Sequence, residues 1–342
     1  MQIKIVRNTD DFLALEQKWN ELFEQGNYSF FQTFNYNYFA FKNILAEDKR
    51  NKLNIILILG NEKTVCICPF YSDKYGVLRF INDLHSDFCD ILLDNKTLYK
   101  KVFLFDKNIS SYRFINLKKD SQFFKIFKAK DFRYVYRKNN ARFSYLTLLK
   151  GDFPINHRSI KSKQKTEFRR VIKKNSSSKH VILSSKYEKF PLGEITQLKN
   201  EMIKLRYRNK YYLNSGFIGL IKKLYEKNEL IISKVSKNGK TQALSFILIK
   251  NNQYLFWIDM FDSSKMINIF NYISLITKLS LIDNIEIHFG RGDYAYKIKN
   301  FLPVVDDLIF IHAFQNKFSE LKFLVLRSLI NILKPIYKNI VK

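Results

Sequence analysis

The second half of the chain shows the clearest alternation of hydrophobic and polar positions. Residues 230–236 and 241–250 have the period of two that is typical of strands, and Asn238-Gly239 between them is a strong turn signal. After this hairpin we expect a strand over 254–261, a helix over 267–283, a strand over 285–289, a short helix over 294–300 and a last strand over 307–314. The predicted order is three antiparallel strands, helix, strand, short helix, strand.

The first half mixes strand and helix patterns. After a short strand over 2–6, Asp10 is placed to cap a helix over 11–24, whose apolar stripe is Phe12, Leu15, Trp19, Leu22 and Phe23. A second helix is expected to begin near Thr33. The other predicted elements are a hairpin over 54–60 and 64–71, a helix over 96–106, and strands over 77–81, 110–117 and 143–149. This half is therefore mixed α and β.

A basic segment follows residues 150–157, where the residue composition of the chain changes. A helix is predicted over 158–174, with one anion, Glu167, against eight cations: Arg158, Lys161, Lys163, Lys165, Arg169, Arg170, Lys173 and Lys174. The cations lie all around this helix, so it is either a solvated helix or a phosphate-binding one. Two further helices are expected over 192–207 and 215–227.

The composition is that of a folded protein with excess positive charge. Hydrophobic residues make up 46% and aromatic residues 16% of the 342 residues, which is too much core material for a disordered chain. With 10 Gly and 5 Pro, a collagenous or linker-dominated protein is excluded. The length allows about two domains. The net charge of +28 reflects either AT-rich coding or anionic partners, such as nucleotide phosphates, RNA or an anionic membrane face.

Cysteine usage and hydropathy bear on the compartment. The three cysteines cannot form a disulfide framework, which fits a reducing environment. Cys66 and Cys68 point to one face of a strand, but a metal site would need two more ligands and no His or Cys lies nearby. No uninterrupted apolar run reaches about 18 residues, and the first residues lack a signal-peptide pattern. We therefore expect a cytoplasmic protein without a metal.

Two segments of the second half carry candidate chemistry. Residues 290–297 (GRGDYAYK) follow a strand and hold two glycines, which allow a ligand to approach the backbone closely. The segment is neither a P-loop nor a dinucleotide-binding fingerprint, because it lacks Gly-Lys-Ser/Thr and a third Gly. Alternation over 254–261 places Leu255, Trp257, Asp259 and Phe261 on one face, and Asp262 follows at the strand end. A carboxylate there can serve as a base toward an attacking ammonium.

Three motifs together resemble the Fem-like and CelD-like branch of the N-acetyltransferase (GNAT) superfamily. They are SKQKTEFRRVIKK (162–174), YLFWIDMFD (254–262) and HFGRGDYAYKIKNF (288–301). The resemblance covers about 155–314 well and the N-terminal half weakly, through SFFQTFNYNYF and DLHSDFCDILL. It implies a mixed α/β (α+β) fold of two GNAT-like domains, with largely antiparallel sheets facing a central cleft. We expect domains over 1–150 and 151–315, and a basic amphipathic C-terminal helix over 316–342.

The function that the resemblance implies is an acyltransferase of the GNAT type. An acyl group would pass from a carrier, with acyl-CoA (acetyl-CoA) as the expected donor, to an amine such as an amino sugar in capsule or lipopolysaccharide biosynthesis. Carried over, Tyr296 and Lys297 lie at the reaction centre, where Lys297 faces the oxyanion and Tyr296 supplies a wall or a proton. Asp259 or Asp262 positions or deprotonates the amine. We expect Lys297 to lie in a loop outside the core.

Further residues are expected to bind the two substrates. The donor's phosphates would be bound by Arg169, Arg170, Ser263 and Ser264. The acceptor would be bound by Trp257, Arg291 and Asp293 and, from the first domain, by Asp87 and Asp90. The family often has an acidic residue at the position of His288, so the identity of the base stays open.

Two alternatives to the acyl-CoA enzyme remain. Residues 262–268 contain no glycine, although acetyl-CoA enzymes of this fold usually have a glycine-rich pyrophosphate loop there. One alternative is a Fem-like peptidyltransferase that uses aminoacyl-tRNA, which the net charge of +28 favours. The other is a catalytically degenerate GNAT scaffold that binds an anionic polymer or another protein, which the missing glycines favour.

The C-terminal tail has an amphipathic pattern over 318–342. Its apolar stripe consists of Phe318, Leu321, Val325, Leu329, Ile332 and Ile336, and its polar side carries Lys322, Arg327, Lys334, Lys338 and Lys342. Pro335 kinks or ends the first helix. Such a helix either docks on its own protein or lies on an anionic membrane surface, which would place the protein at the inner face of the membrane.

Overall fold

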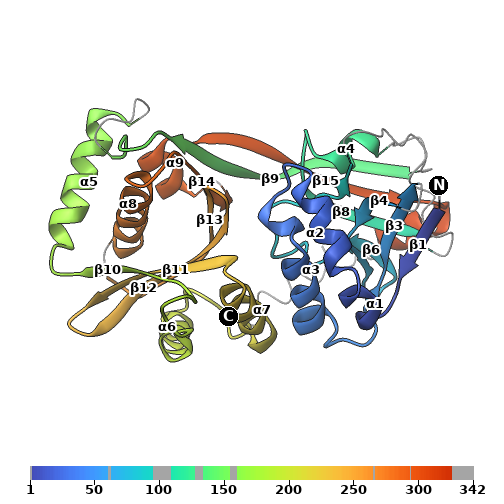
Figure 1. Ribbon diagram of the computed structural model, residues 1–342, viewed down its shortest axis with the longest axis horizontal. Helices are drawn as coiled ribbons and strands as arrows, with labels where there is room; N and C mark the ends of the chain where they lie inside the picture. The colour runs from blue at the N-terminus through green and yellow to red at the C-terminus, as the bar shows by residue number, and fades with distance from the viewer. Residues whose placement is uncertain are drawn as a thin grey trace. The chain divides into compact units, whose positions relative to one another are not determined.

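The computed structural model describes residues 2–60, 63–94, 109–127, 134–154, 160–264, 266–292 and 294–325. The chain forms two compact units (Figure 1). Unit 1 comprises Met1–Asn27, Asp48–Asn140 and Leu308–Lys342, and unit 2 comprises Tyr28–Glu47 and Ala141–Asp307. The units thus differ from the contiguous domains expected over 1–150 and 151–315, because segments distant in the sequence pack together in each unit.

Unit 1 contains two sheets. The first has the strand order β1-β3-β4-β7 and is formed by β1 (Gln2–Val6), β3 (Ile55–Gly60), β4 (Lys63–Cys68) and β7 (Leu92–Leu93). The second has the order β9-β15-β8-β6-β5-β2, formed by parts of β9 (Tyr134–Leu148) and β15 (Val304–Phe314) with β8 (Ser111–Lys118), β6 (Val77–Phe80), β5 (Phe70–Ser72) and β2 (Lys52–Leu53). T-shaped and tilted pairs among the rings of Phe70, Phe80, Phe114 and Phe123 fill the core of this unit.

The helix expected over 11–24 is two helices, α1 (Thr9–Leu13) and α2 (Glu16–Glu24). Asn8, rather than Asp10, caps α1, because its Oδ1 accepts a hydrogen bond of 2.8 Å from the backbone N–H of Asp11. The predicted apolar stripe is nonetheless correct, since all five of its side chains are buried. A short helix, α4 (Gln122–Ile126), completes the described helices of unit 1 before the tail.

Unit 2 is built on one sheet with the order β10-β11-β12-β13-β14-β9. Its further strands are β10 (Lys179–Leu183), β11 (Leu230–Lys237), β12 (Lys240–Lys250), β13 (Gln253–Phe261) and β14 (Ile285–Arg291). Its helices are α3 (Phe34–Ala40), α5 (Ser162–Lys174), α6 (Leu192–Lys204), α7 (Ser215–Glu226), α8 (Ile267–Ser280) and α9 (Ala295–Phe301), with the short turns η1 (Phe30–Gln32) and η2 (Phe41–Leu45). The predicted order of the second half is confirmed.

Local signals account for several of these elements. Asn238 and Gly239 both have positive φ, 50° and 78°, as the predicted two-residue hairpin requires. Thr33 caps α3 by accepting from the N–H of Tyr36 at 3.2 Å, as expected for a helix that begins there. The aromatic segment 28–41 belongs to unit 2 because its rings pack on Trp257, 6.4 Å from Phe31 and 5.8 Å from Tyr36 between centroids.

Strands β13 and β14 run parallel but pair over three residues only, Gln253–Leu255 against Glu286–His288. Beyond this point each strand has a bulge. The bulge in β13 is seen against β12. Phe246 and Ile247 are adjacent in β12, but their partners in β13 are Ile258 and Phe256, so Trp257 is the extra residue. In β14 the extra residue is Phe289, between His288 and Gly290. The two strands therefore part beside α8 and α9, where backbone groups no longer pair across the gap.

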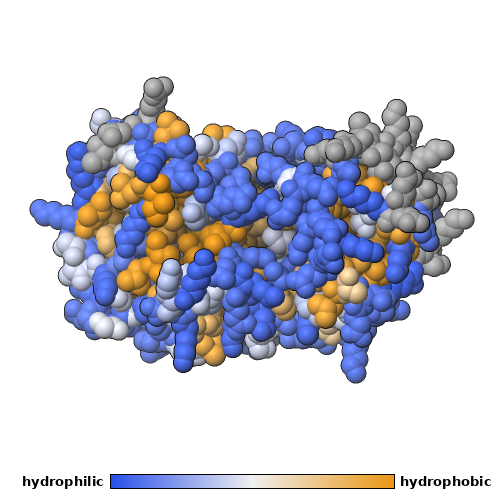
Figure 2. Space-filling view, in the orientation of Figure 1, coloured by the Kyte–Doolittle hydropathy of each residue, from blue (hydrophilic) through white to orange (hydrophobic). Residues whose placement is uncertain are grey.

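The remaining predictions concern the ends of segments. The helix expected over 96–106 lies outside the described residues, as do residues 158 and 159 of the basic helix. Residues 160 and 161 are described and are not helical, so this helix begins at Ser162, four residues later than expected. The tail is helical over 317–325, and the rest of the predicted helix lies outside the described residues. Among the described helices, none is both long and apolar enough to cross a membrane. On the face shown in Figure 2, hydrophobic side chains gather over unit 2 near α8 and β13.

Candidate functional site

Asp259 lies on β13 beyond the point where β13 and β14 part. Its carboxylate is held by two hydroxyl groups: Ser245 donates to Oδ1 at 2.7 Å, and Tyr272 donates to Oδ2. The backbone carbonyl of Asp259 also accepts from the hydroxyl of Tyr212 at 3.2 Å. Side chains from β12 and α8 thus fix the partly buried carboxylate, and one from the loop after α6 holds the backbone of the same residue.

The bulge in β13 decides which way Asp259 faces. The sequence predicts Trp257 and Asp259 on one face, and this is wrong. Trp257 packs against Phe217, with 5.2 Å between ring centroids, and against the aromatic segment 28–41. Asp259 instead lies on the face of α8, with Phe256 and Tyr272. One extra residue reverses the alternation, because side chains in a strand change face at every position.

A chain of hydrogen bonds supports Asp259 from inside the sheet. Asn271 donates to Ser245 Oγ at 3.0 Å and accepts from Ser233 Oγ at 2.7 Å. Ser233 Oγ in turn lies 2.8 Å from His180 Nε2. Because the carboxylate only accepts, Ser245 must donate to it, and every donor in the chain points toward Asp259. Burial, and then the charge of Lys278, lowers the pKa of His180 to about 4, so the ring is neutral at pH 7.

Two tyrosines complete the cluster. The hydroxyl of Tyr296, in α9, lies 3.5 Å from that of Tyr272. Burial raises the pKa of both phenols well above the ordinary value, and the nearby Asp259 carboxylate adds to this. Burial also raises the pKa of Tyr212 to about 12. The three phenols are therefore neutral at physiological pH and can donate hydrogen bonds or a proton.

Lys297 is a buried residue of α9, with 4% of its surface exposed, and the prediction of a loop position outside the core is wrong. Its ammonium donates to the carbonyl of Phe289, the bulged residue of β14. It also lies 5.1 Å from the ring centroid of Tyr294. The side chain of Lys297 points inward from α9, where its ammonium satisfies the buried carbonyl of the bulged residue Phe289.

No protein-family model and no curated protein sequence matches the chain. Solved structures, however, match it over nearly its whole length. FemX is 8% identical, with 94% of this chain and 99% of that chain covered and a TM-score of 0.62. The C-terminal domain (DUF2156) of a protein from Agrobacterium fabrum described as a lysylphosphatidylglycerol synthetase is 10% identical, with 94% and 98% covered and a TM-score of 0.59. A tandem GNAT protein from the clavulanic acid biosynthesis pathway is 8% identical, with 91% and 98% covered and a TM-score of 0.52.

The chain has a tandem GNAT-like fold. The predicted mixed α/β class and the GNAT resemblance are thereby confirmed at the level of the fold. The likeness extends equally to proteins of different branches, so it does not single out the CelD-like, polysaccharide branch.

In this GNAT-like fold the glycine motif shapes the end of β14. Gly292 has φ of +106° and its N–H donates to the carbonyl of Arg142 at 2.7 Å. A Cβ at Gly292 would lie 2.8 Å from the ring of Tyr294, so glycine is required there. Arg291 is partly buried beside it, and Asp293 lies outside the described residues.

The residues predicted to bind the donor occupy two places. Ser263, which is exposed, and Ser264 lie in the loop before α8. Asp262, the other residue predicted to position or deprotonate the amine, is buried in this loop and organises it by accepting from the N–H of Ser264 at 2.8 Å. On α5, Arg170 forms a two-pronged ion pair with Glu167, with N–O distances of 2.8 and 2.6 Å, and Arg169 is exposed. Arg169 is therefore open to solvent, whereas the carboxylate of Glu167 offsets much of the positive charge of Arg170.

Asp87 and Asp90 belong to unit 1. Asp87 is buried. Both carboxylate oxygens of Asp90 accept backbone N–H groups, from Ile91 and Gln122 at 2.8 Å and from Phe123 at 2.7 Å. These bonds hold the start of α4, and burial raises the pKa of Asp90 to about 6. The structure therefore gives Asp90 a capping role within unit 1.

Some members of the site escape prediction from sequence. Ser245, Asn271 and Tyr272 complete the site, and none of them lies in a recognisable motif. One usable signal exists: α8 is apolar almost all around, so Asn271 and Tyr272 within it must find buried partners. Among the described residues, no group of three or more His, Cys, Asp or Glu side chains is arranged to hold a metal ion.

Proposed function

We propose that unit 2 transfers an acyl group from an activated carrier to a primary amine. The observation that carries this proposal is the carboxylate of Asp259, fixed by Ser245 and Tyr272 where two parallel strands part, with the Tyr296 hydroxyl beside it. The tandem GNAT-like fold supports it, since GNAT proteins are acyltransferases by name. Beyond Leu255 and His288 the two strands no longer pair with each other, and this is the place where we expect an extended acyl carrier to lie.

The chemistry follows from the charges of this cluster. Asp259 binds the acceptor as an ammonium and takes one proton from it. The free amine attacks the acyl carbon, so that a C–N bond forms and the carbonyl oxygen gains the negative charge. When the bond from carbon to the carrier's sulfur or oxygen breaks, the nitrogen loses its second proton and the leaving group gains one. The neutral Tyr296 hydroxyl gives its proton to the leaving group and takes the proton of the nitrogen, so it ends unchanged. No covalent enzyme intermediate is needed.

Lys297 enters this proposal in two ways. Its ammonium fixes the bulged carbonyl of Phe289, which keeps β14 away from β13. It also brings a positive charge to the end of the gap, where it favours the oxyanion. Arg291 stays a predicted acceptor contact, and an amino sugar stays the predicted acceptor. Trp257 is withdrawn from this role, because it packs on Phe217 and the segment 28–41 and faces away from Asp259.

The donor class has two candidates. Acyl-CoA is the first, because a thioester gives the acyl activation that the cluster requires. Aminoacyl-tRNA is the second: residues 262–268 lack glycine, Met266 is the N-cap residue before α8 with φ of 67°, and α5 exposes several cations. The name of one similar protein, a lysylphosphatidylglycerol synthetase, contains an aminoacyl group, which favours an aminoacyl donor.

Calorimetry with two donors separates these candidates. If acyl-CoA is the donor, acetyl-CoA binds after RNase treatment, and the double variant Arg169→Ala and Arg170→Ala binds it less tightly. The matched control is Lys173→Ala with Lys174→Ala, which removes the same charge from the same helix. Binding of charged tRNA without heat from acetyl-CoA assigns the donor to aminoacyl-tRNA.

A transfer assay tests the reaction itself. Radiolabelled acetyl-CoA, or tRNA carrying a labelled amino acid, is incubated with glucosamine and with a small-molecule cell extract. We expect labelled amide from the wild type and much less from Asp259→Asn and Tyr296→Phe, both of which preserve shape. Absence of label from either donor, with binding of polyanions retained, contradicts transfer and supports the non-catalytic scaffold.

A further inference from the structure

A cavity of about 310 Å³ lies on one sheet face of unit 1, and none of its lining residues belongs to the cluster around Asp259. It is lined by Tyr136, Arg137, Lys138, Phe310, His312 and Phe323. This volume is at the lower end of the range for small-molecule sites, about 300–1,000 Å³. Three of the six lining side chains are aromatic and two are cationic, which is the combination that binds planar anions.

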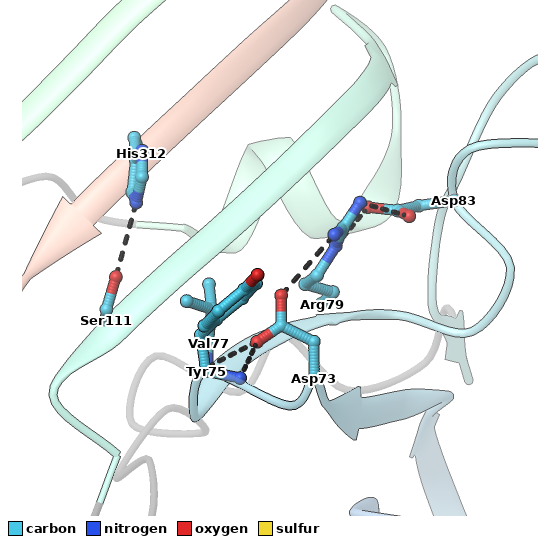
Figure 3. A network of polar contacts seen from close by, with 7 residues as sticks. All are labelled: Asp73, Tyr75, Val77, Arg79, Asp83, Ser111 and His312. Carbon is cyan, nitrogen blue, oxygen red and sulfur yellow. Dashed lines mark hydrogen bonds and ion pairs between the residues drawn. The ribbon is translucent and has the colours of Figure 1, made fainter. Parts of the chain in front are cut away.

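His312 provides a polar group inside this cavity wall. Its ring is 5% exposed, and Nε2 lies 3.2 Å from Ser111 Oγ on the neighbouring strand β8 (Figure 3). Nδ1 is buried and has no hydrogen-bond partner among the described residues. Burial lowers the pKa of His312 to about 4, with Arg113 and Arg79 adding to the effect. A neutral ring with one unused nitrogen can make one hydrogen bond to a ligand.

Two cations, Lys138 and Arg113, lie close to the ring of Phe310, and neither forms an ion pair with a carboxylate of the described residues. Lys138 Nζ lies 5.4 Å and the guanidinium of Arg113 lies 5.8 Å from the centre of its ring. The nearby carboxylates of Asp83 and Asp73 are both used by Arg79, at 2.8 and 3.5 Å (Figure 3). Over the part of the chain that the structure describes, no carboxylate pairs with Arg113 or Lys138, and Arg113 Nε is buried without a partner.

We propose that this cavity binds a nucleotide: a base against the aromatic rings of Phe310 and Phe323, and a phosphate on the lining cation Lys138, with the charge of Arg113 close by at the ring of Phe310. Aromatic rings and cations on one sheet face are a sequence-tolerant platform for bases and phosphates. His312 Nδ1 supplies a hydrogen bond to the base edge. The ligand is either a free nucleotide or the unpaired end of an RNA, which share this chemistry. One oxygen of the Glu320 carboxylate accepts from the hydroxyl of Tyr136, and no ion pair joins this carboxylate to Lys138 or Arg113 among the described residues.

Calorimetry on the full chain tests the proposal with AMP, adenosine, inorganic phosphate and a single-stranded hexamer of adenylate. We expect AMP to bind at least about tenfold more tightly than adenosine or phosphate, because both the ring and the charge contribute. Tighter binding of the hexamer than of AMP assigns the site to RNA, and equal binding assigns it to free nucleotides.

Variants locate the binding. Lys138→Glu and Phe310→Leu should each weaken AMP binding by about tenfold or more. Lys18→Glu, at an exposed position of α2, makes the same charge change elsewhere in unit 1 and should leave AMP binding unchanged. The proposal is overturned if AMP binds no better than phosphate, or if Lys138→Glu and Lys18→Glu have equal effects. Neither result affects the proposed transfer reaction, because no residue of unit 2 is changed.

Discussion

Tyr272 donates a hydrogen bond from its hydroxyl to Oδ2 of Asp259, 13 positions earlier in the chain. The contact joins the middle of α8 to the end of β13, and a bulge at Trp257 is what makes it possible. The same carboxylate receives Ser245 on its other oxygen. This is the arrangement on which the proposed chemistry depends.

Replacing Asp259 should separate chemistry from folding. We expect Asp259→Asn to reduce turnover by about 10²–10⁴-fold, because the amide cannot take a proton from the acceptor. The fold should persist, since the amide oxygen still accepts from Ser245 or Tyr272. Asp262→Asn, in the loop before α8, is the comparison. Equal losses of turnover in the two variants would contradict a special role for Asp259.

Lys297 should contribute to stability as well as to activity. Lys297→Met leaves the buried carbonyl of Phe289 without a donor, and we expect the free energy of unfolding to fall by about 1–3 kcal/mol. Turnover should fall by about 10²–10³-fold if the ammonium also faces the oxyanion. Lys299→Met, exposed on the same helix, should change stability by less than about 0.5 kcal/mol. Urea denaturation measures both variants, and equal midpoints would argue against the buried contact.

Replacement of two glycines by alanine should change the stability of the protein in opposite directions. Gly292→Ala forces a side chain into φ of +106° beside Tyr294, and we expect a loss of about 1–3 kcal/mol. Gly193→Ala lies in the first turn of α6, with open space around the new Cβ, and should stabilise by about 0.4–1 kcal/mol. Thermal unfolding of the two variants tests this, and a stable Gly292→Ala protein would mean that the turn after β14 adjusts freely.

His180 makes stability depend on pH. Its pKa is lowered to about 4 in the folded protein, so between the ordinary value near 6.5 and about 4 the unfolded chain binds more protons. The stability associated with the neutral ring is therefore present above pH 6.5 and is lost as the pH falls toward 4. His180→Gln keeps a donor to Ser233 and should show a smaller loss over this interval. His312 contributes in the same direction, so the dependence should decrease without disappearing.

The tail provides a test of membrane attachment. Over 317–325 the stripe residues Phe318, Leu321 and Val325 are 77%, 56% and 50% exposed, whereas Phe323 packs on His312 with 4.1 Å between ring centroids. Deletion should therefore begin after Val325, which keeps Phe323 in place. We expect the full chain to sediment with anionic liposomes and to release at high salt, and the shortened chain to stay in solution. Aggregation of the shortened chain would indicate that the tail covers its own protein.

The sequence by itself determined the elements that depend on neighbours along the chain. The hairpin at Asn238-Gly239, the start of α3 at Thr33 and the order of strands and helices from 230 to 314 follow from turn chemistry and hydrophobic period. These signals act over a few residues, so they survive whatever the rest of the fold does. The motif 290–297 likewise indicated the end of β14, and Gly292 has the backbone conformation that its glycine suggested.

Only the tertiary structure decided how these elements make a site. One extra residue at Trp257 turned Asp259 toward α8, and periodicity cannot reveal an unpaired residue because a bulge depends on the neighbouring strand. Burial of Lys297 depends on the carbonyl freed by the bulge at Phe289, which lies in another element. Asn271 is bonded to Ser233, 38 residues earlier in the chain, and to Ser245, 26 residues earlier. Such partners are chosen by packing in space, which the local pattern of the sequence does not contain.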